Sequence, residues 1–147
     1  MELDLGSFAS IHRFASNWNR QWPQGSGHKG EGALRPLHVL VLNAGVICKT
    51  FESTSDGLEA TFGVNYLGHF YLQQLLTGAL MAVQGEPSRV ISVTSNGHWL
   101  FHSRTVPLDA ASVPRVAANF SMFGAYGEAK LANILHMRQL AVLQVCR

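Results

Sequence analysis

Apolar side chains recur at the three- and four-residue spacing of an amphipathic helix in three stretches of the chain, residues 3–18, 57–83 and 125–145. The second stretch follows Asp56 and Glu59, which lie three residues apart and resemble a capping box with Asp in the usual Ser/Thr place. The pattern therefore predicts three helices, and the second one is expected to start directly after Asp56.

Two short and nearly continuous apolar runs lie between the predicted helices, at residues 37–42 and 89–94. Such runs are typical of parallel strands that are covered on both faces. Because one long helix separates them, the two runs predict a β-α-β unit. Two strands alone do not make a stable sheet. The fold class that we expect is therefore α/β, as part of a doubly wound, Rossmann-like parallel sheet.

The segments between these elements are polar or irregular. Residues 19–36 contain four glycines and two prolines and predict a loop, and residues 95–121 show no regular pattern. Gly25, Gly27 and Gly30 match G-x-G-x-x-G, but a dinucleotide-binding turn needs a strand before it and a helix after it. Neither is predicted beside these glycines, so we interpret them as part of the loop.

The 147 residues are 47% hydrophobic and only 14% charged, against about 25% charged in a typical soluble domain. This composition excludes a disordered chain. A membrane-spanning helix needs a run of about 18 apolar residues, and the sequence contains no such run. The formal charge of +2 is too small to predict a nucleic-acid partner by charge alone. The scarcity of charge leaves the chain short of residues for a polar surface.

The two cysteines, Cys48 and Cys146, are too few and too far apart for a disulfide framework. The N-terminus has neither the basic nor the apolar region of a secretory signal. We therefore expect a cytoplasmic or otherwise intracellular protein without a signal peptide or membrane anchor. His98 and His102 lack a third metal ligand, and the sequon at Asn119 lacks a secretory context, so we expect neither a metal site nor a glycan.

Tyr126 and Lys130 stand one helical turn apart in the third predicted helix. Residues at i and i+4 share a helix face, and an ammonium near a phenol lowers the pKa of the phenol from about 10. Such a tyrosine can act as a general acid or base near neutral pH. By itself the pair is more often a surface contact. Asn43 and Ser95, however, follow the two predicted strands at the same sheet edge, where α/β proteins bind ligands, and Asn65 places an amide inside the apolar second helix.

Together, four segments resemble the short-chain dehydrogenase/reductase family, in particular its retinol dehydrogenase and WW-domain-containing oxidoreductase branch. They are L-H-V-L-V-L-N-A-G (37–45), D-G-L-E-A-T-F-G-V-N-Y-L-G-H-F (56–70), R-V-I-S-V-T-S (89–95) and Y-G-E-A-K-L-A-N (126–133). The phrase F-G-V-N-Y-L-G-H-F-Y-L at 62–72 is quite specific, and L-D-L at 3–5 resembles the end of the family's third strand. The resemblance extends from residue 3 to about residue 140.

The resemblance implies catalytic roles for four residues. Tyr126 would exchange a proton with the substrate oxygen, and Lys130 would lower the pKa of Tyr126 and hold the nicotinamide ribose. Ser95 would polarise the substrate carbonyl, and Asn65 would support a water that leads protons to Lys130. The implied cofactor is NAD or NADP. Besides Tyr126 and Lys130, the residues implied to bind it are Asn43, Ala44, Gly45, Asp4 and Leu5.

The chain also departs from the family pattern. Family members begin with a strand and a T-G-x-x-x-G-x-G turn that binds the pyrophosphate, and this glycine motif is absent before Asp4. The sequence also stops before the family's sixth strand. We therefore expect residues 1–147 to be an incomplete domain that lacks the first βαβ portion and the C-terminal strands, with residues 19–36 as a Gly-rich loop or insertion.

Three hypotheses about function stay open. In the first, the chain is an NAD(P)-dependent oxidoreductase that interconverts an alcohol and a carbonyl on a small lipophilic substrate, retinoid-, steroid- or otherwise lipid-like. In the second, it is a truncated and inactive isoform or fragment that associates with a full-length relative, as a homo- or heterodimer through helices 57–83 and 125–145. In the third, the fragment does not fold stably, because its strand edges are unpaired.

Overall fold

The computed structural model describes residues 2–20, 34–101 and 117–145. The elements in chain order are α1 (Phe8–Arg20), β1 (Val39–Leu42), α2 (Ala60–Phe62), η1 (Gly63–Leu67), α3 (Gly68–Met81), β2 (Arg89–Ser92), α4 (Gly97–Leu100), η2 (Ala117–Asn119) and α5 (Met122–Val145). η1 is a π-helical turn that joins α2 to α3 without a break, and η2 is a short 3-10 helix.

The described residues form one sheet, in which β1 and β2 pair in parallel. The register sets Val39 opposite Arg89 and Leu42 opposite Ser92, and the backbone N–H of Val93 extends the ladder by donating to the carbonyl of Leu42. The continuous helix α2–η1–α3 connects the two strands. The predicted β-α-β unit and the α/β fold class are therefore confirmed.

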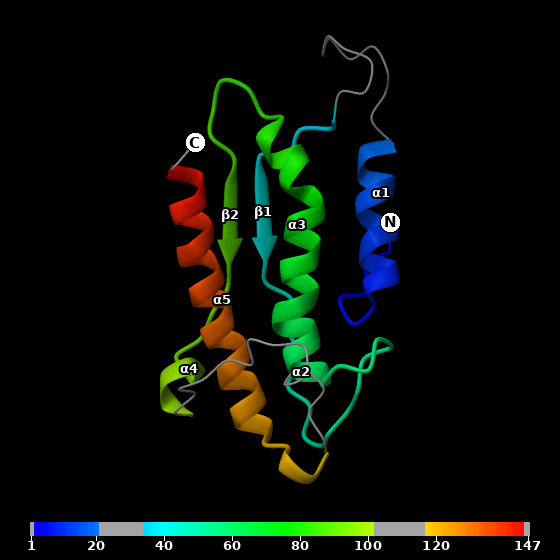
Figure 1. Ribbon diagram of the computed structural model, residues 1–147, viewed down its shortest axis with the longest axis vertical. Helices are drawn as coiled ribbons and strands as arrows, with labels where there is room; N and C mark the ends of the chain where they lie inside the picture. The colour runs from blue at the N-terminus through cyan, green and yellow to red at the C-terminus, as the bar shows by residue number, and fades with distance from the viewer. Residues whose placement is uncertain (1, 21–33, 102–116, 146–147) are drawn as a thin grey trace.

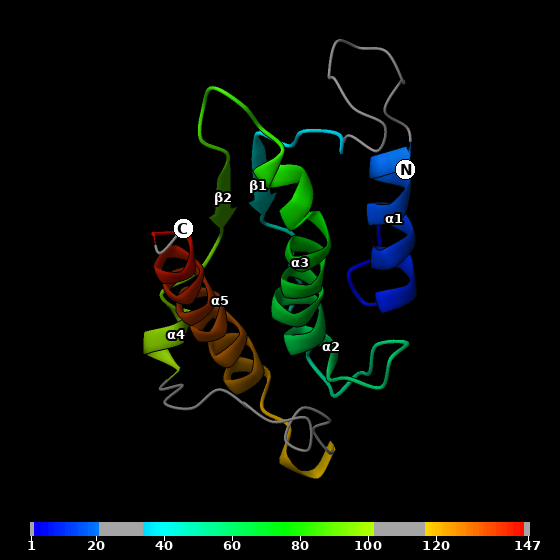
Figure 2. The same ribbon diagram turned by 45° about the horizontal axis from the view of Figure 1, so that its top comes forward.

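The three long helices α1, α3 and α5 lie on the same side of this sheet (Figures 1 and 2). Successive strand residues point to opposite faces, and Leu40, Leu42 and Val90 point toward the helices, where they join the core. The side chains of the other face remain between 37% and 54% exposed within the described part of the chain; they are Val39, Val41, Ile91 and Val93.

A first core cluster joins α1, β1 and α3. Ile11 and Ala15 of α1 pack against Leu42 and against Leu72 and Leu76 of α3. These residues recur at helical spacing along α1 and α3, which is why the amphipathic pattern predicted both helices. The first predicted helix therefore exists and has a packing partner in α3, although it begins at residue 8 rather than at residue 3.

The predicted capping box at Asp56 is wrong. Glu59 is the N-cap residue, and its carboxylate accepts hydrogen bonds from the N–H groups of Thr61 (2.8 Å) and Phe62 (2.7 Å). Gly57 has a φ of 77°, a left-handed conformation that a helix does not contain, so the helix starts three residues later than expected. Asp56 instead accepts a hydrogen bond from the N–H of Phe8 (2.8 Å), at the start of α1.

Other boundaries differ by a few residues at the element ends. The strands are two residues shorter than the apolar runs, the second helix spans 60–81, and α5 begins at residue 122. Among the described residues, no helix is both long enough and apolar enough to cross a bilayer. The glycines of the 19–36 loop, together with His102 and Cys146, lie outside the described residues.

Candidate functional site

A groove of about 260 Å³ opens at the carboxyl ends of the two parallel strands. Parallel α/β sheets place their ligands at this edge, because the loops that leave the strands diverge there. The residues that line the groove come from the segment after β1, from the segment after β2 and from one face of α5: Asn43, Gly45, Val46, Ile47, Val93, Thr94, Tyr126 and Lys130. The structure thus brings together four of the residues singled out in the sequence.

Tyr126 and Lys130 share one face of α5, as their spacing predicted. The ammonium nitrogen of Lys130 lies 5.6 Å from the centre of the Tyr126 ring. The lysine is only 5% exposed, and its Nζ donates a hydrogen bond to the carbonyl of Val93 (2.9 Å). The Thr94 hydroxyl donates to the backbone carbonyl of Lys130 (2.9 Å). The first bond positions the lysine side chain against the end of β2, and the second holds the backbone of α5 at the same place.

Asn65 lies in the π-helical turn η1 and is fully buried. Its side chain bonds to both backbone groups of Val46: Oδ1 accepts from the N–H (2.7 Å), and Nδ2 donates to the carbonyl (2.8 Å). A Cβ on Gly45 would lie 2.9 Å from the Asn65 Oδ1, so glycine is required for this close approach. Asn65 therefore holds the loop after β1 in place. π-Helical turns often occur at functional sites.

Two residues that the sequence analysis missed bond to the backbone carbonyl of Asn65. Nδ2 of Asn133 donates to this oxygen (3.2 Å), and Nδ1 of His69 lies at the same distance from it. Both side chains are buried. The signal that could have found them is their position, since Asn133 follows Lys130 and His69 follows Asn65 by about one helical turn. The bond from Asn133 ties α5 to η1, whereas the His69 contact lies within the continuous helix η1–α3.

The environment of His69 favours its neutral form. Burial lowers the pKa of His69, and the charge of Lys130 lowers it further, although the bond to the Asn65 carbonyl acts in the opposite direction. A neutral ring that donates from Nδ1 fits this bond. The ammonium of Lys130 therefore carries the positive charge in this part of the site.

Ser95 lies three residues after the end of β2, beside the groove. Its hydroxyl accepts a hydrogen bond from the N–H of Gly97 (3.1 Å) and lies 3.3 Å from the Asn96 amide oxygen. The Tyr126 ring packs directly on Gly97, where a Cβ would stand 3.0 Å from Tyr126 Cε1. The turn that carries Ser95 and the ring of Tyr126 are therefore neighbours.

The remaining predicted cofactor residues do not all lie at this groove. Ala44 is exposed in the loop between Asn43 and Gly45. Asp4 accepts a hydrogen bond from the N–H of Gly6 (2.8 Å), and Leu5 packs against the first core cluster, so neither lines the groove. Their role in adenine binding stays a prediction.

Among the described residues, no three side chains of the metal-ligating types come together. His98 bonds through Nδ1 to the carbonyl of Ser95. The groove itself presents a phenol, that of Tyr126, beside a lysine whose Nζ is bonded to the Val93 carbonyl.

Known proteins resemble this chain in both sequence and structure. No family model matches it. The chain is 35% identical over 142 residues to a WW domain-containing oxidoreductase of Gallus gallus, and 36% identical over 140 residues to retinol dehydrogenase 12 of Mus musculus. These matches cover 95% of this chain but 31% and 38% of the relatives, so the chain spans about a third of their length.

Two solved structures share the fold. An uncharacterized protein from Mycobacterium paratuberculosis matches with a TM-score of 0.68 and 29% identity, over 95% of this chain and 42% of that one. RhlG of Pseudomonas aeruginosa, solved as an NADP active-site complex, matches with a TM-score of 0.62 and 22% identity, over 99% of this chain and 47% of that one. The elements described above therefore correspond to under half of each neighbour.

Proposed function

Because the chain belongs to the short-chain dehydrogenase/reductase family, we propose that its groove serves the interconversion of an alcohol and a carbonyl with NAD or NADP. The observation that carries the proposal is the position of Tyr126 and Lys130 opposite Asn43 and Gly45 in one groove at the carboxyl ends of the strands. The names of the relatives, which include retinol dehydrogenase, point to a lipophilic alcohol as the substrate class.

The groove residues fit the ribose end of such a cofactor. An ammonium has three donors, and Lys130 uses one of them on the Val93 carbonyl. The other two remain for a pair of ribose hydroxyls at the groove. Gly45 leaves the backbone of the loop after β1 accessible. When bound, NAD(P) would supply the nicotinamide ring that accepts or donates the hydride.

The protein's own residues would handle the proton. In the oxidation direction, the phenolate oxygen of Tyr126 takes the proton of the substrate hydroxyl as the carbonyl forms, and it returns that proton in the reverse direction. The Lys130 ammonium, 5.6 Å from the centre of the Tyr126 ring, would be the neighbouring positive charge during this proton exchange. Ser95 donates a hydrogen bond to the substrate oxygen after exchanging its present contact with Asn96.

The test combines cofactor binding with turnover. The wild-type chain is titrated with NADH and NADPH, with nicotinamide fluorescence as the signal, and then assayed for reduction of retinal. We expect saturable binding with a dissociation constant below about 100 μM. Tyr126→Phe should lower turnover by at least about 100-fold while leaving cofactor binding intact. Lys130→Met should weaken both.

The control variant is Tyr71→Phe. Tyr71 packs edge-on against Phe8 in the first core, away from the groove, so removing its hydroxyl should change neither binding nor turnover. If the wild type shows no saturable cofactor binding, or if Tyr126→Phe retains full turnover, the proposal is wrong.

A second candidate function is association with a full-length relative through α5 and α3. The observation in its favour is a set of exposed apolar side chains on α5: Phe123, Leu135, Val142 and Leu143. Co-expression with a tagged full-length relative should give a complex that Leu135→Glu together with Val142→Glu disrupts. Failure of the wild-type chain to co-purify would refute this candidate.

A further inference from the structure

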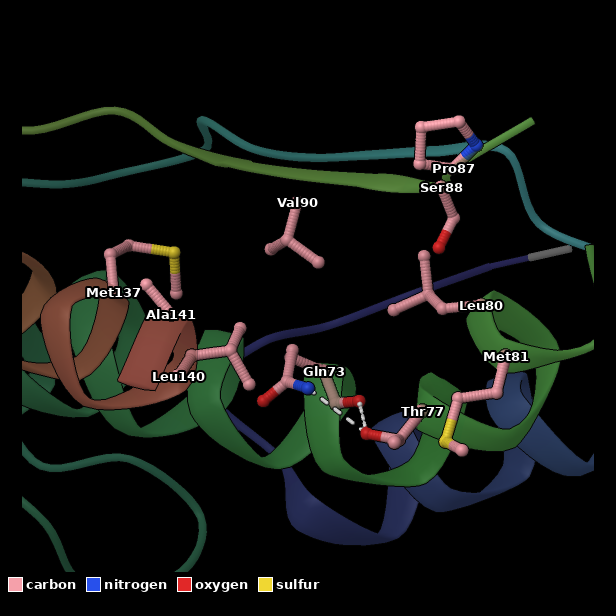
Figure 3. A pocket seen from close by; sticks show the side chains of 10 residues that line it. All are labelled: Gln73, Thr77, Leu80, Met81, Pro87, Ser88, Val90, Met137, Leu140 and Ala141. Atoms are coloured by element: carbon pink, nitrogen blue, oxygen red, sulfur yellow. Dashed lines mark hydrogen bonds between the residues drawn. The ribbon is translucent and has the colours of Figure 1, made fainter. Parts of the chain in front are cut away.

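A second cavity lies at the other end of the strands, between α3, α5 and the start of β2 (Figure 3). Its volume is about 420 Å³, within the range of roughly 300–1,000 Å³ that is typical of small-molecule sites. Of the described residues, none lines both this cavity and the groove at Tyr126. The cavity occurs where α5 diverges from α3, since the two helices come together near α2 and separate toward their C-terminal ends (Figures 1 and 2).

The walls of this cavity are largely apolar. Leu80 of α3, Val90 of β2, and Met137 and Leu140 of α5 surround the empty space in Figure 3. Among the described residues that line it, none carries a charge. An ionised ligand would lose its hydration there without gaining an opposite charge, and that exchange is strongly unfavourable. The lining therefore selects for an uncharged, mainly aliphatic occupant.

One wall carries a buried amide with bonding capacity to spare. Gln73 is 1% exposed; its Nε2 donates to the Thr77 hydroxyl (2.9 Å), and its Oε1 accepts from Gln74 (3.1 Å). An amide offers two N–H donors and two acceptor positions. One donor and one acceptor position therefore remain, and Figure 3 shows the amide at the cavity between Thr77 and Leu140. A hydroxyl group could use both positions, because it donates and accepts.

We propose that this cavity is a binding site for an uncharged aliphatic alcohol, with the hydroxyl on the Gln73 amide and the chain along the apolar walls. The thioether side chains of Met137 and Met81 suit such an occupant, since methionine adapts to irregular apolar shapes. The site is independent of the proposed oxidoreductase chemistry, because it lies at the opposite edge of the sheet from Tyr126.

Methionine-methyl NMR tests the proposal directly. The chain labelled with methyl-¹³C methionine is titrated with 1-decanol, decanoate and decylammonium at pH 7. We expect 1-decanol to shift the resonances of Met81 and Met137 saturably and to leave that of Met122 unchanged, because Met122 lies outside the cavity. The two ions should cause no saturable shift. Equal responses to all three compounds, or an equal shift at Met122, would overturn the proposal.

Two variants localise the binding. Ala141→Trp places an indole at the cavity and should abolish the shifts, whereas Leu135→Trp on the same helix lies outside the lining and should preserve them. Gln73→Leu should weaken 1-decanol binding by about tenfold or more, because the hydroxyl loses both of its hydrogen bonds to the amide. Tyr126→Phe should leave binding unchanged. Binding that survives both Ala141→Trp and Gln73→Leu, or that Tyr126→Phe abolishes, would refute the assignment.

Discussion

The helices α3 and α5 meet at one end and diverge at the other, and the two ends differ in chemistry. At the end near α2 and η1, the buried polar side chains of Asn65, Lys130 and Asn133 all bond to backbone groups of other segments. At the opposite end, mainly apolar side chains line a cavity of about 420 Å³. Directional bonds fix the relative position of segments, whereas apolar contacts tolerate a gap. The first end is therefore suited to hold reacting groups, and the second to admit a ligand.

The largest effect on stability should come from Phe62, at the end where α3 and α5 meet. Phe62 packs there with Ala129 and Ala132 of α5 in a second core cluster. Phe62→Ala should lower the free energy of unfolding by about 3–5 kcal/mol, because the small alanines around it cannot fill the vacated space. Urea denaturation followed by circular dichroism measures the change. Phe14→Ala, at a half-buried position on α1, is the matched control and should cost less. If both variants lose the same free energy of unfolding, Phe62 does not have the special packing role that the comparison assigns to it.

The next effect should come from Asn65. Asn65→Leu removes both bonds to Val46 and should destabilise the protein by about 2–4 kcal/mol, since two backbone groups lose their partner. The same denaturation experiment measures it. Asn96→Leu, at an exposed position beside α4, should change stability little. If Asn65→Leu unfolds at the same urea concentration as the wild type, the buried polar bonds at the end where α3 and α5 meet do not contribute to stability, and the comparison is wrong.

The pH dependence of stability reports on His69, which bonds to the Asn65 carbonyl at the end where α3 and α5 meet. Its pKa is lowered in the folded protein, so the unfolded chain binds a proton more readily below pH 6.5, the ordinary pKa of histidine. Stability should therefore fall as the pH drops from 6.5 toward the lower folded-state pKa. His136, whose pKa burial also lowers, adds to this slope. Thermal melts from pH 7.5 to 5 measure it.

The matched variant for this titration is His69→Asn, which keeps a side-chain N–H without the titrating ring. It should reduce the pH dependence of the melting temperature. A pH profile that stays identical in His69→Asn would show that the ring does not titrate differently on folding.

The smallest effect on stability should come from Thr77, beside the cavity at the end where α3 and α5 diverge. Thr77→Val removes the hydroxyl that donates to the Gln73 carbonyl and accepts from the Gln73 amide, and it should cost about 1 kcal/mol. Thr77→Ser keeps both bonds and should recover most of that loss. If Thr77→Val lowers the free energy of unfolding as much as Asn65→Leu does, the two ends of the α3–α5 pair do not differ in how strongly polar bonds stabilise them.

Local sequence patterns were sufficient to predict the type and the order of the long helices and of the two strands. The apolar spacing of Ile11 and Ala15, or of Leu72 and Leu76, comes from a single helix face, so a short window of sequence contains the whole signal. The pairing of Tyr126 with Lys130 is likewise local. Ser95 and Asn65 were singled out by their positions after a strand and inside a helix, and the family resemblance added only the roles that they are expected to have.

Contacts between distant segments could not be predicted in this way. Asp56 was assigned to its own helix, but its carboxylate bonds to Phe8, because the left-handed Gly57 turns the chain there. The bond from Asn133 to Asn65 spans 68 residues, and nothing in either local pattern indicates it. The cavity at Met137 likewise results from the divergence of two helices, a property of their packing rather than of either sequence.

The bond between Phe8 and Asp56 also bears on the order of folding. It joins positions 48 residues apart, and the Ser55 hydroxyl adds a second link, to the Gly6 carbonyl. Closing so long a loop costs chain entropy before these contacts form. The N-terminal turn of α1 should therefore gain its amide protection only after β1 and the segment before α2 are in place. Pulse-labelling hydrogen exchange during refolding would record that turn as a late step.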